Sequence, residues 1–145
     1  MKKNFASNII IIKDNKYLLQ LRSGGAKVKE KNTWGLFGGH CKLNEKSEKC
    51  VCRELKEETN LRIKKPKFLF RFFVKEFQAD VCVFSKKIKK IDNFQLNEGV
   101  DYNFFTKQEI LNKSTLDKKN LRISKITYNI FKKFFSVHKS SQLSY

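Results

Sequence analysis

The sequence predicts an α/β (α+β) sandwich in which a mixed β-sheet lies between helices. Runs rich in Val, Ile and Phe, the composition of strands, precede and follow one helical segment in the middle of the chain. A second segment with helical spacing stands near the C-terminus. Strands that bracket helices in this order are typical of a sheet covered by helices on both faces.

The first strands form a predicted hairpin. Asn8 to Lys13 is an apolar run, Asp14 and Asn15 have turn chemistry, and Lys16 to Arg22 is the second strand. Ser23 to Asn32 is polar and contains two glycines, so we expect a surface loop there.

The central helix is predicted from Ser47 to Thr59. Ser47 is the expected N-cap, and Glu48 lies in the first turn, where the helix dipole favours negative charge. Asn60 tolerates a left-handed conformation and is expected to end the helix.

The second half of the chain alternates between strands and helices. Phe68 to Phe77, Ala79 to Ile88 and Asp101 to Phe105 are expected strands. Thr106 and Glu109 have capping-box spacing for a short helix. The terminal helix is predicted from apolar residues at intervals of three and four, namely Leu121, Ile123, Ile126, Ile130, Phe131, Phe134 and Phe135.

Length and composition favour one folded domain over residues 1–145, with a core of about 7–137 and a tail at 138–145. We expect a cytoplasmic protein without a membrane partner, because the chain shows neither a long apolar run nor a signal-peptide core. The four cysteines have no C-x-x-C spacing, which argues against zinc, and we expect them to be reduced core thiols.

The chain is strongly basic, with 32 Lys and Arg against 14 Asp and Glu and a formal charge of +18. Such a charge attracts polyanions, so RNA is a possible partner. The alternative is that the charge is a compositional bias, because 27 of the 32 cations are lysines scattered along the chain.

Three carboxylates, Glu54, Glu57 and Glu58, fall on one face of the central helix. Like charges at this spacing repel, unless a cation lies between them. Magnesium prefers oxygen ligands of this kind, and Gly38 and Gly39 upstream would let a backbone carbonyl approach. Pairing of the glutamates with neighbouring lysines on a solvated helix is the alternative.

The order of the residues favours metal binding over pairing with lysines. Gly39 to Leu61 resembles the Nudix box, G-x5-E-x7-R-E-U-x-E-E-x-G-U, in which U is a bulky aliphatic residue. The matching identities are Gly39, Glu45, Arg53, Glu54, Glu57 and Glu58, and the matching aliphatics are Leu55 and Leu61. Asn60 replaces the family glycine, and Phe37 stands where many members have proline.

The resemblance implies a Nudix-type α/β/α sandwich and a Mg²⁺-dependent hydrolase, with Mn²⁺ as a possible substitute. Glu54, Glu57 and Glu58 would bind metal together with the Gly39 carbonyl, and Arg53 would orient a glutamate. Members of the Nudix family hydrolyse nucleoside diphosphate derivatives, and small members often form homodimers. Glu57, Glu54, Arg53 and Glu98 are the expected catalytic residues, with Glu45 stabilising the box.

Some roles stay open at this stage. Glu98 is either an extra ligand or base, or a turn residue before Gly99. Trp34, Phe37, Phe73 and Phe105 are candidates to stack on a base, although aromatic residues in strands usually belong to the core. His40 follows the glycines and is expected to be a polar neighbour rather than a ligand of phosphate or metal.

Three functions are compatible with the box. The first is a nucleoside triphosphate pyrophosphohydrolase, and the second is a hydrolase of nucleotide sugars, dinucleoside polyphosphates or RNA 5′ ends. The third is a non-catalytic module that binds RNA, which the complete set of glutamates disfavours.

Overall fold

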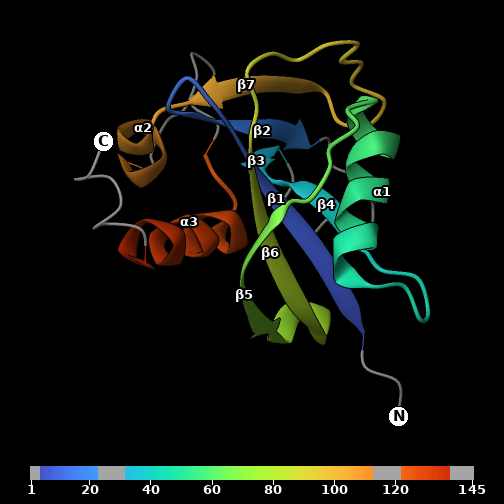
Figure 1. Ribbon diagram of the computed structural model, residues 1–145. Helices are drawn as coiled ribbons and strands as arrows, with labels where there is room; N and C mark the ends of the chain where they lie inside the picture. Colours follow the sequence, from blue (N-terminus) through green and yellow to red (C-terminus); the bar gives the residue numbers. More distant parts are fainter. Residues whose placement is uncertain (1–3, 23–31, 113–121, 138–145) are drawn as a thin grey trace.

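The computed structural model describes residues 4–22, 32–112 and 122–137. Its elements are β1 (Phe5–Lys13), β2 (Lys16–Arg22), β3 (Thr33–Gly35), β4 (Phe37–His40), α1 (Ser47–Thr59), β5 (Lys67–Val74), the 3-10 turn η1 (Lys75–Phe77), β6 (Ala79–Lys87), β7 (Asp101–Phe105), α2 (Lys107–Asn112) and α3 (Lys125–Val137). Figure 1 shows α1 on one side of the strands and α2 and α3 on the other. The predicted mixed sheet between helices is therefore confirmed.

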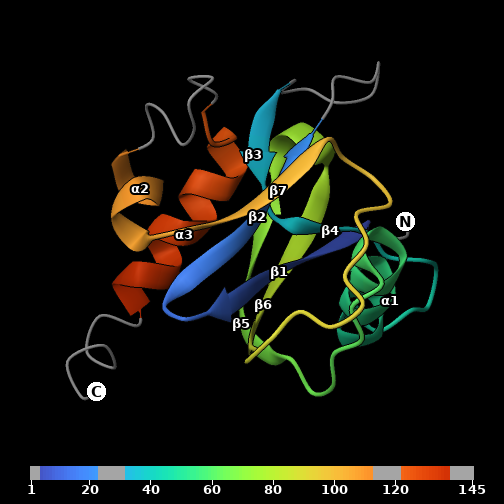
Figure 2. The same ribbon diagram turned by 90° about the horizontal axis from the view of Figure 1, so that it is seen from above.

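The sheet has seven strands in the order β3-β2-β1-β6-β5, with β4 paired to β1 and β7 paired to β2. The pairing of β1 with β6 is parallel, whereas the other pairs are antiparallel. β1 changes its neighbour along one edge: Ala6 to Ile9 pair with β4, and Ile12 and Lys13 pair with β2. Figure 2 shows β2 and β4 diverging from this edge, and the Glu58 carboxylate lies between them, where it accepts hydrogen bonds from Gln20 of β2 and from the Gly38 amide of β4.

Two apolar layers hold the helices against the sheet. The layer under α3 includes Ile10, Leu19, Trp34, Phe105 and Phe131, all of which are nearly inaccessible to solvent. The layer under α1 includes Ile9, Leu18, Phe37, Leu55 and Phe84. Alternating residues of β1 and β2 thus point into opposite layers, as the twofold repeat of a strand requires.

Most local predictions agree with the structure. Asp14 and Asn15 form the hairpin turn with positive φ, and Asn60 ends α1 at φ 64°. The Thr106 amide donates to Glu109 Oε1 at 2.9 Å and the Glu109 amide donates to Thr106 Oγ1 at 3.1 Å, which is the capping box. Among the described residues, no helix is both long and apolar enough to cross a membrane.

Several boundaries differ from the prediction. Lys46, not Ser47, is the N-cap of α1, because the Cys50 amide bonds to the Lys46 carbonyl and makes Ser47 the first helical residue. The strand expected to reach Phe77 ends at Val74, where η1 begins. Ile123 forms an isolated bridge with Trp34, so α3 starts two residues later. Leu121, most of the loop 23–32 and the tail 138–145 lie outside the described residues.

Candidate active site

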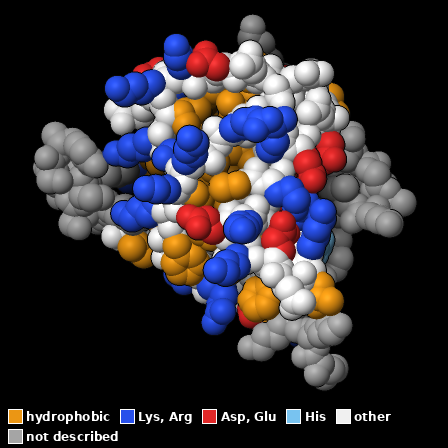
Figure 3. All heavy atoms as spheres, turned by 45° about the vertical axis from the view of Figure 1, so that its right-hand side comes forward, with side chains coloured by type: hydrophobic (Ala, Val, Ile, Leu, Met, Phe, Trp, Pro, Cys, Tyr) orange, Lys and Arg blue, Asp and Glu red, His pale blue; other side chains and the backbone are white. Residues whose placement is uncertain are grey.

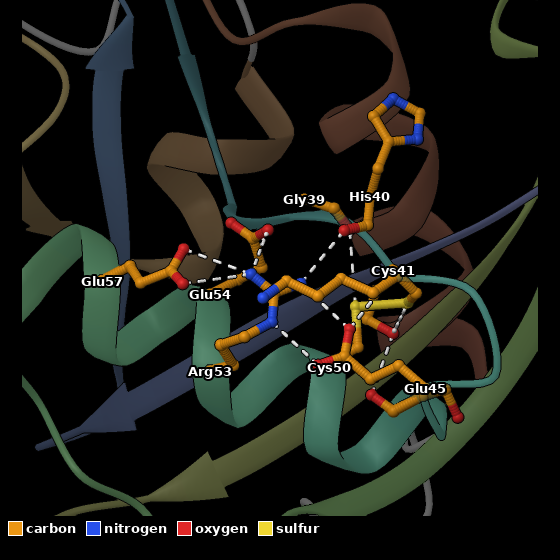
Figure 4. The surroundings of a disulfide bond; sticks show 11 residues. Gly39, His40, Cys41, Glu45, Cys50, Arg53, Glu54 and Glu57 are labelled. Carbon is orange, nitrogen blue, oxygen red and sulfur yellow. Dashed lines mark hydrogen bonds and ion pairs between the residues drawn. A yellow bond between two sulfur atoms is a disulfide. The ribbon is translucent and has the colours of Figure 1, made fainter.

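Arg53 lies at the centre of the carboxylates that α1 presents (Figure 4). Its guanidinium donates to Glu45 at 2.8 and 2.9 Å, to Glu54 at 3.1 Å and to both oxygens of Glu57 at 3.2 Å. The positive charge of Arg53 therefore offsets part of the repulsion among the carboxylates. The bidentate pair with Glu45 is of the kind that fixes side-chain orientation.

The same guanidinium ties the loop before α1 to the helix. Arg53 also donates to the His40 carbonyl at 3.2 Å, while the Lys42 amide donates to Glu45 at 2.9 Å. The hydrogen bond from Arg53 is the main reason that the pKa of Glu45 is lowered to about 2. Glu45 thus forms a salt bridge with Arg53 and connects the loop before α1 to the helix.

Glu58 is the most buried acid of the cluster, with 3% of its surface exposed. Its carboxylate fills the gap between β2 and β4, where Gln20 Nε2 and the Gly38 amide each donate to it at 3.0 Å. Burial raises the pKa of Glu58 to about 7. Gln20 was not predicted from the sequence, although a polar residue inside the apolar run of β2 is a signal for such a role.

The two glycines of β4 allow two close approaches, that of β1 to Gly38 and that of α1 to Gly39. Gly38 has φ +148°, and a Cβ atom there would lie 2.0 Å from the Ser7 carbonyl oxygen. A Cβ atom on Gly39 would lie 2.6 Å from both Cδ and Oε2 of Glu54. Glu54 therefore occupies the space that the missing side chain leaves free.

Replacing Gly39 by alanine is expected to displace the Glu54 carboxylate and to weaken divalent-metal binding about tenfold to a hundredfold, a range typical for residues that orient ligands. Calorimetric titration with Mn²⁺ measures this change. Gly35→Ala is the matched control, because its Cβ would meet nothing closer than Thr127 Oγ1 at 3.4 Å. Equal affinities in the two variants would contradict the assigned position of Glu54.

The expectation of four reduced cysteines is wrong for two of them. Cys41 and Cys50 form a disulfide, with 5.2 Å between their Cα atoms, whereas Cys52 and Cys82 are free. The loop between the first pair folds back because the Glu45 amide bonds to the Lys42 carbonyl and Arg53 holds the Glu45 carboxylate. Cys50 Sγ lies 3.8 Å from the Gly39 carbonyl oxygen, so the disulfide is next to the predicted backbone ligand.

Glu98 lies on the segment that passes over the C-terminal end of α1. The Asn97 amide donates to the Glu58 carbonyl at 2.8 Å, and Asn97 Nδ2 donates to the Glu57 carbonyl at 2.9 Å. Burial raises the pKa of Glu54, and the negative charges of Glu57 and Glu98 shift it in the same direction. Glu98 is therefore close enough to act on the cluster electrostatically.

A pocket of about 460 Å³ opens beside Gly38 and Gly39, on the α3 side of the sheet. This volume lies within the usual range for small-molecule sites. Its lining is Ala6, Asn8, Arg22, Thr33, Gly35, Leu36, Gly38, Gly39, His40, Glu76, Phe77, Val81, Ser124, Lys125, Ile126 and Thr127. The sequence did not identify this pocket, because it joins β1, β3 and the start of α3.

The predicted stacking residues do not meet at the site. Trp34, Phe37 and Phe105 are at most 1% exposed and belong to the core, and Trp34 packs edge-on against Phe105. Phe73 is exposed on β5, the outer strand of the sheet. The His40 ring points away from the carboxylates in Figure 4 and lies 6.5 Å from the Phe77 ring, between ring centroids.

The chain matches a known family model and shares its fold with solved structures. A family model described as the NUDIX domain matches residues 2–125. The MutT protein from Methanosarcina mazei Go1 has a TM-score of 0.75 at 19% identity, over 96% of this chain and 99% of its own. The E. coli ORF135 protein has a TM-score of 0.73 at 16% identity, over 97% and 94%.

A C. elegans Ap4A hydrolase has a TM-score of 0.67 at 17% identity, over 93% of this chain and 98% of its own. No curated protein matches the sequence. Identities this low indicate a common fold, whereas the family model extends over most of the residues and includes the whole box. The chain therefore belongs to the Nudix hydrolase family.

Proposed function

We propose that the protein is a magnesium-dependent hydrolase that cleaves a phosphoanhydride bond of a nucleoside diphosphate derivative, with nucleoside triphosphates as its main substrates. The observation that carries this proposal is the cluster of Glu54, Glu57 and Glu58 on α1, next to Gly39, which also lines the pocket of about 460 Å³. The Nudix family acts on nucleotide derivatives and is generally dependent on divalent metals. The chain supplies both parts of such a site.

The donor set fits a hard divalent cation. Glu54 fills the space above Gly39, and both Glu54 and Glu58 have raised pKa values, chiefly because burial removes their carboxyl groups from water. Glu54, Glu57, Glu58 and the Gly39 carbonyl would hold Mg²⁺, or Mn²⁺ in its place, through oxygen atoms. When bound, the cation supplies positive charge that neutralises phosphate oxygens and lowers the pKa of water.

Other roles in the reaction, the orientation of the carboxylates and the acceptance of a proton, fall to residues of the chain. Arg53 keeps Glu54 and Glu57 oriented, and Gln20 holds Glu58 in place. Glu57 is the most exposed of the three carboxylates, with 53% of its side chain accessible, so it can accept a proton from the attacking water. Glu98 is the second candidate for this base, since its negative charge contributes to the raised pKa of Glu54.

The pocket next to Gly39 would hold the nucleoside part of the substrate. Leu36, Val81 and Ile126 give it apolar walls, while Asn8 and Arg22 offer polar groups that can select a base or sugar. Because the pocket and Glu54 flank the same glycine, a bound nucleoside would direct its phosphates toward the carboxylates. This arrangement favours an enzyme over a module that only binds.

A screen that separates the reaction products by ion-exchange chromatography tests the proposed activity, because a triphosphate cut to its monophosphate releases pyrophosphate and not inorganic phosphate. Nucleoside triphosphates, nucleotide sugars, dinucleoside polyphosphates and triphosphorylated RNA are incubated with the protein, with and without Mg²⁺. We expect hydrolysis that requires Mg²⁺ and is fastest for a nucleoside triphosphate. Binding of nucleotides without turnover across the whole panel would instead identify a non-catalytic module.

A further inference from the structure

The disulfide between Cys41 and Cys50 connects the sheet to α1 beside the candidate metal site. Cys41 directly follows β4, and its amide donates to the Phe5 carbonyl of β1 at 2.8 Å, so its backbone is held to the sheet. Cys50 lies in the first turn of α1 and is fully buried. Figure 4 shows the bond next to Gly39 and Arg53. The disulfide is therefore a covalent link between the two elements that carry the expected metal ligands.

The expected ligands come from both sides of this link. The Gly39 carbonyl belongs to β4, whereas the three predicted carboxylate ligands belong to α1. One cation can bind all of them only if β4 and α1 keep their separation to within about 0.5 Å. Cys50 Sγ lies 3.8 Å from the Gly39 carbonyl oxygen, so the state of this sulfur also affects the carbonyl directly.

Reduction changes both the link and the surroundings of the carbonyl. The Cys41 side chain is then no longer bonded to α1, so the separation of β4 and α1 varies more. The Cys50 thiol gains an S–H that can donate weakly to the Gly39 oxygen, the atom that the cation needs. The Gly38 amide still donates to Glu58 at 3.0 Å, so the site persists in a looser form. Metal binding is therefore expected to weaken on reduction and not to disappear.

The two sulfur atoms differ in their accessibility. Cys41 is half-buried, whereas Cys50 is fully buried, so an attacking thiolate reaches Cys41 Sγ. The attack forms a mixed disulfide with Cys41, and Cys50 leaves as a thiolate that takes up a proton; the positive end of the α1 dipole favours this anion. The second thiol of the reductant then displaces Cys41, which also takes up a proton. The protein thus gains two electrons and two protons, and the reductant becomes a disulfide.

The surface around the disulfide is positively charged. Lys42, Lys46 and Lys49 are exposed and lie within a few residues of the two cysteines. Figure 3 brings the α1 side of the molecule forward and shows more Lys and Arg than Asp and Glu side chains on this face. Because a positive potential concentrates anions, thiolates and negatively charged reductants are drawn toward the bond.

We propose that Cys41 and Cys50 form a thiol–disulfide exchange site that takes a dithiol reductant, and that opening the bond lowers the affinity of the neighbouring carboxylates and carbonyl for divalent metal. The inference rests on the proposed function, because it concerns regulation of the metal site of the same hydrolase. The oxidised protein is the form that binds metal tightly. Compartments with different redox poise therefore hold the protein in forms of different metal affinity.

Electron paramagnetic resonance of free Mn²⁺ tests this inference, because it measures metal affinity without a substrate. The oxidised protein is compared with protein reduced by dithiothreitol, which is removed by gel filtration under nitrogen. We expect a Kd for Mn²⁺ about tenfold higher after reduction, as for other groups that orient ligands. Cys41→Ser keeps the buried Cys50 but cannot form the bond, so it should bind Mn²⁺ as weakly as the reduced protein, with or without treatment. Thermal melts verify that each form is folded at the assay temperature.

Cys52→Ser is the matched control, because Cys52 is a free, half-buried cysteine of the same helix. It should keep the tenfold response to reduction. Equal Mn²⁺ affinities of the oxidised and reduced unaltered protein would overturn the proposal. So would a count of free thiols that rises after dithiothreitol treatment only when urea has unfolded the protein.

The chromatographic screen judges the proposed function separately. A redox-dependent Mn²⁺ affinity without turnover of any nucleotide would reject the hydrolase and support the exchange site. Turnover together with equal Mn²⁺ affinities in the two forms would reject the exchange site and support the hydrolase.

Discussion

Glu57→Gln is expected to lower kcat for the best nucleotide by about a hundredfold to ten-thousandfold, the usual contribution of a positioned general base. Glutamine keeps the size of the side chain but removes its charge and basicity. Because the Glu57 side chain is 53% exposed and bonds to Arg53 at the helix surface, the melting temperature should change little. Initial rates at saturating Mg²⁺, together with a thermal melt, measure both effects.

Glu48→Gln is the control for this substitution. It is the same chemical change on an exposed residue of the same helix, one that lies in the first turn and away from Arg53. We expect its rate to stay near that of the unaltered protein. A Glu57→Gln rate that equals the Glu48→Gln rate would assign the base to another residue, with Glu98 as the next to be replaced.

The unfolding free energy of the metal-free protein is expected to fall by about 3 kcal/mol as the pH rises from below 4.5 to above 7, because one pKa unit corresponds to about 1.4 kcal/mol. Burial raises the pKa of Glu58 from 4.5 to about 7, so the folded state binds this proton more tightly than the unfolded state. The stabilisation is complete below pH 4.5 and is lost as the pH passes through 7. Urea unfolding across this interval measures it.

Glu58→Gln should flatten this pH dependence, since glutamine does not titrate and can still contact the Gly38 amide through its carbonyl oxygen. In the unaltered protein, Mg²⁺ should oppose the loss of unfolding free energy at higher pH, because it favours ionised carboxylates. Glu45 acts at lower pH and in the opposite direction: its pKa is lowered to about 2, so its stabilising effect is full well above pH 4.5 and is lost as the pH falls from about 4.5 through 2. An unchanged pH dependence in Glu58→Gln would show that another group is responsible.

Local sequence patterns predicted the parts of the fold that depend on local physics. The hairpin turn at Asp14–Asn15, the left-handed Asn60 and the capping box at Thr106 each follow from the conformational preferences of a few neighbouring residues. The carboxylates of α1 were found in the same way, because helical spacing alone places Glu54 and Glu57 on one face.

The rest of the site depends on contacts between distant segments. Gln20 reaches Glu58 only because β1 pairs with β4 along its first half and with β2 along its second half, so that the two strands separate around the Glu58 carboxylate. The pocket needs the start of α3 to lie beside β4. Such pairings over long separations are not encoded in the periodicity of any single element.

The bond between Cys41 and Cys50 joins two parts of the box that lie nine positions apart in the sequence. A dithiol reagent in a purification buffer would convert this closed ring into an open loop. The strand that carries Gly39 would then be fastened to the helix by non-covalent contacts, chiefly those of Arg53 with Glu45 and with the His40 carbonyl. Preparations made with and without such reagents are therefore chemically distinct proteins, and a metal affinity measured for one does not apply to the other.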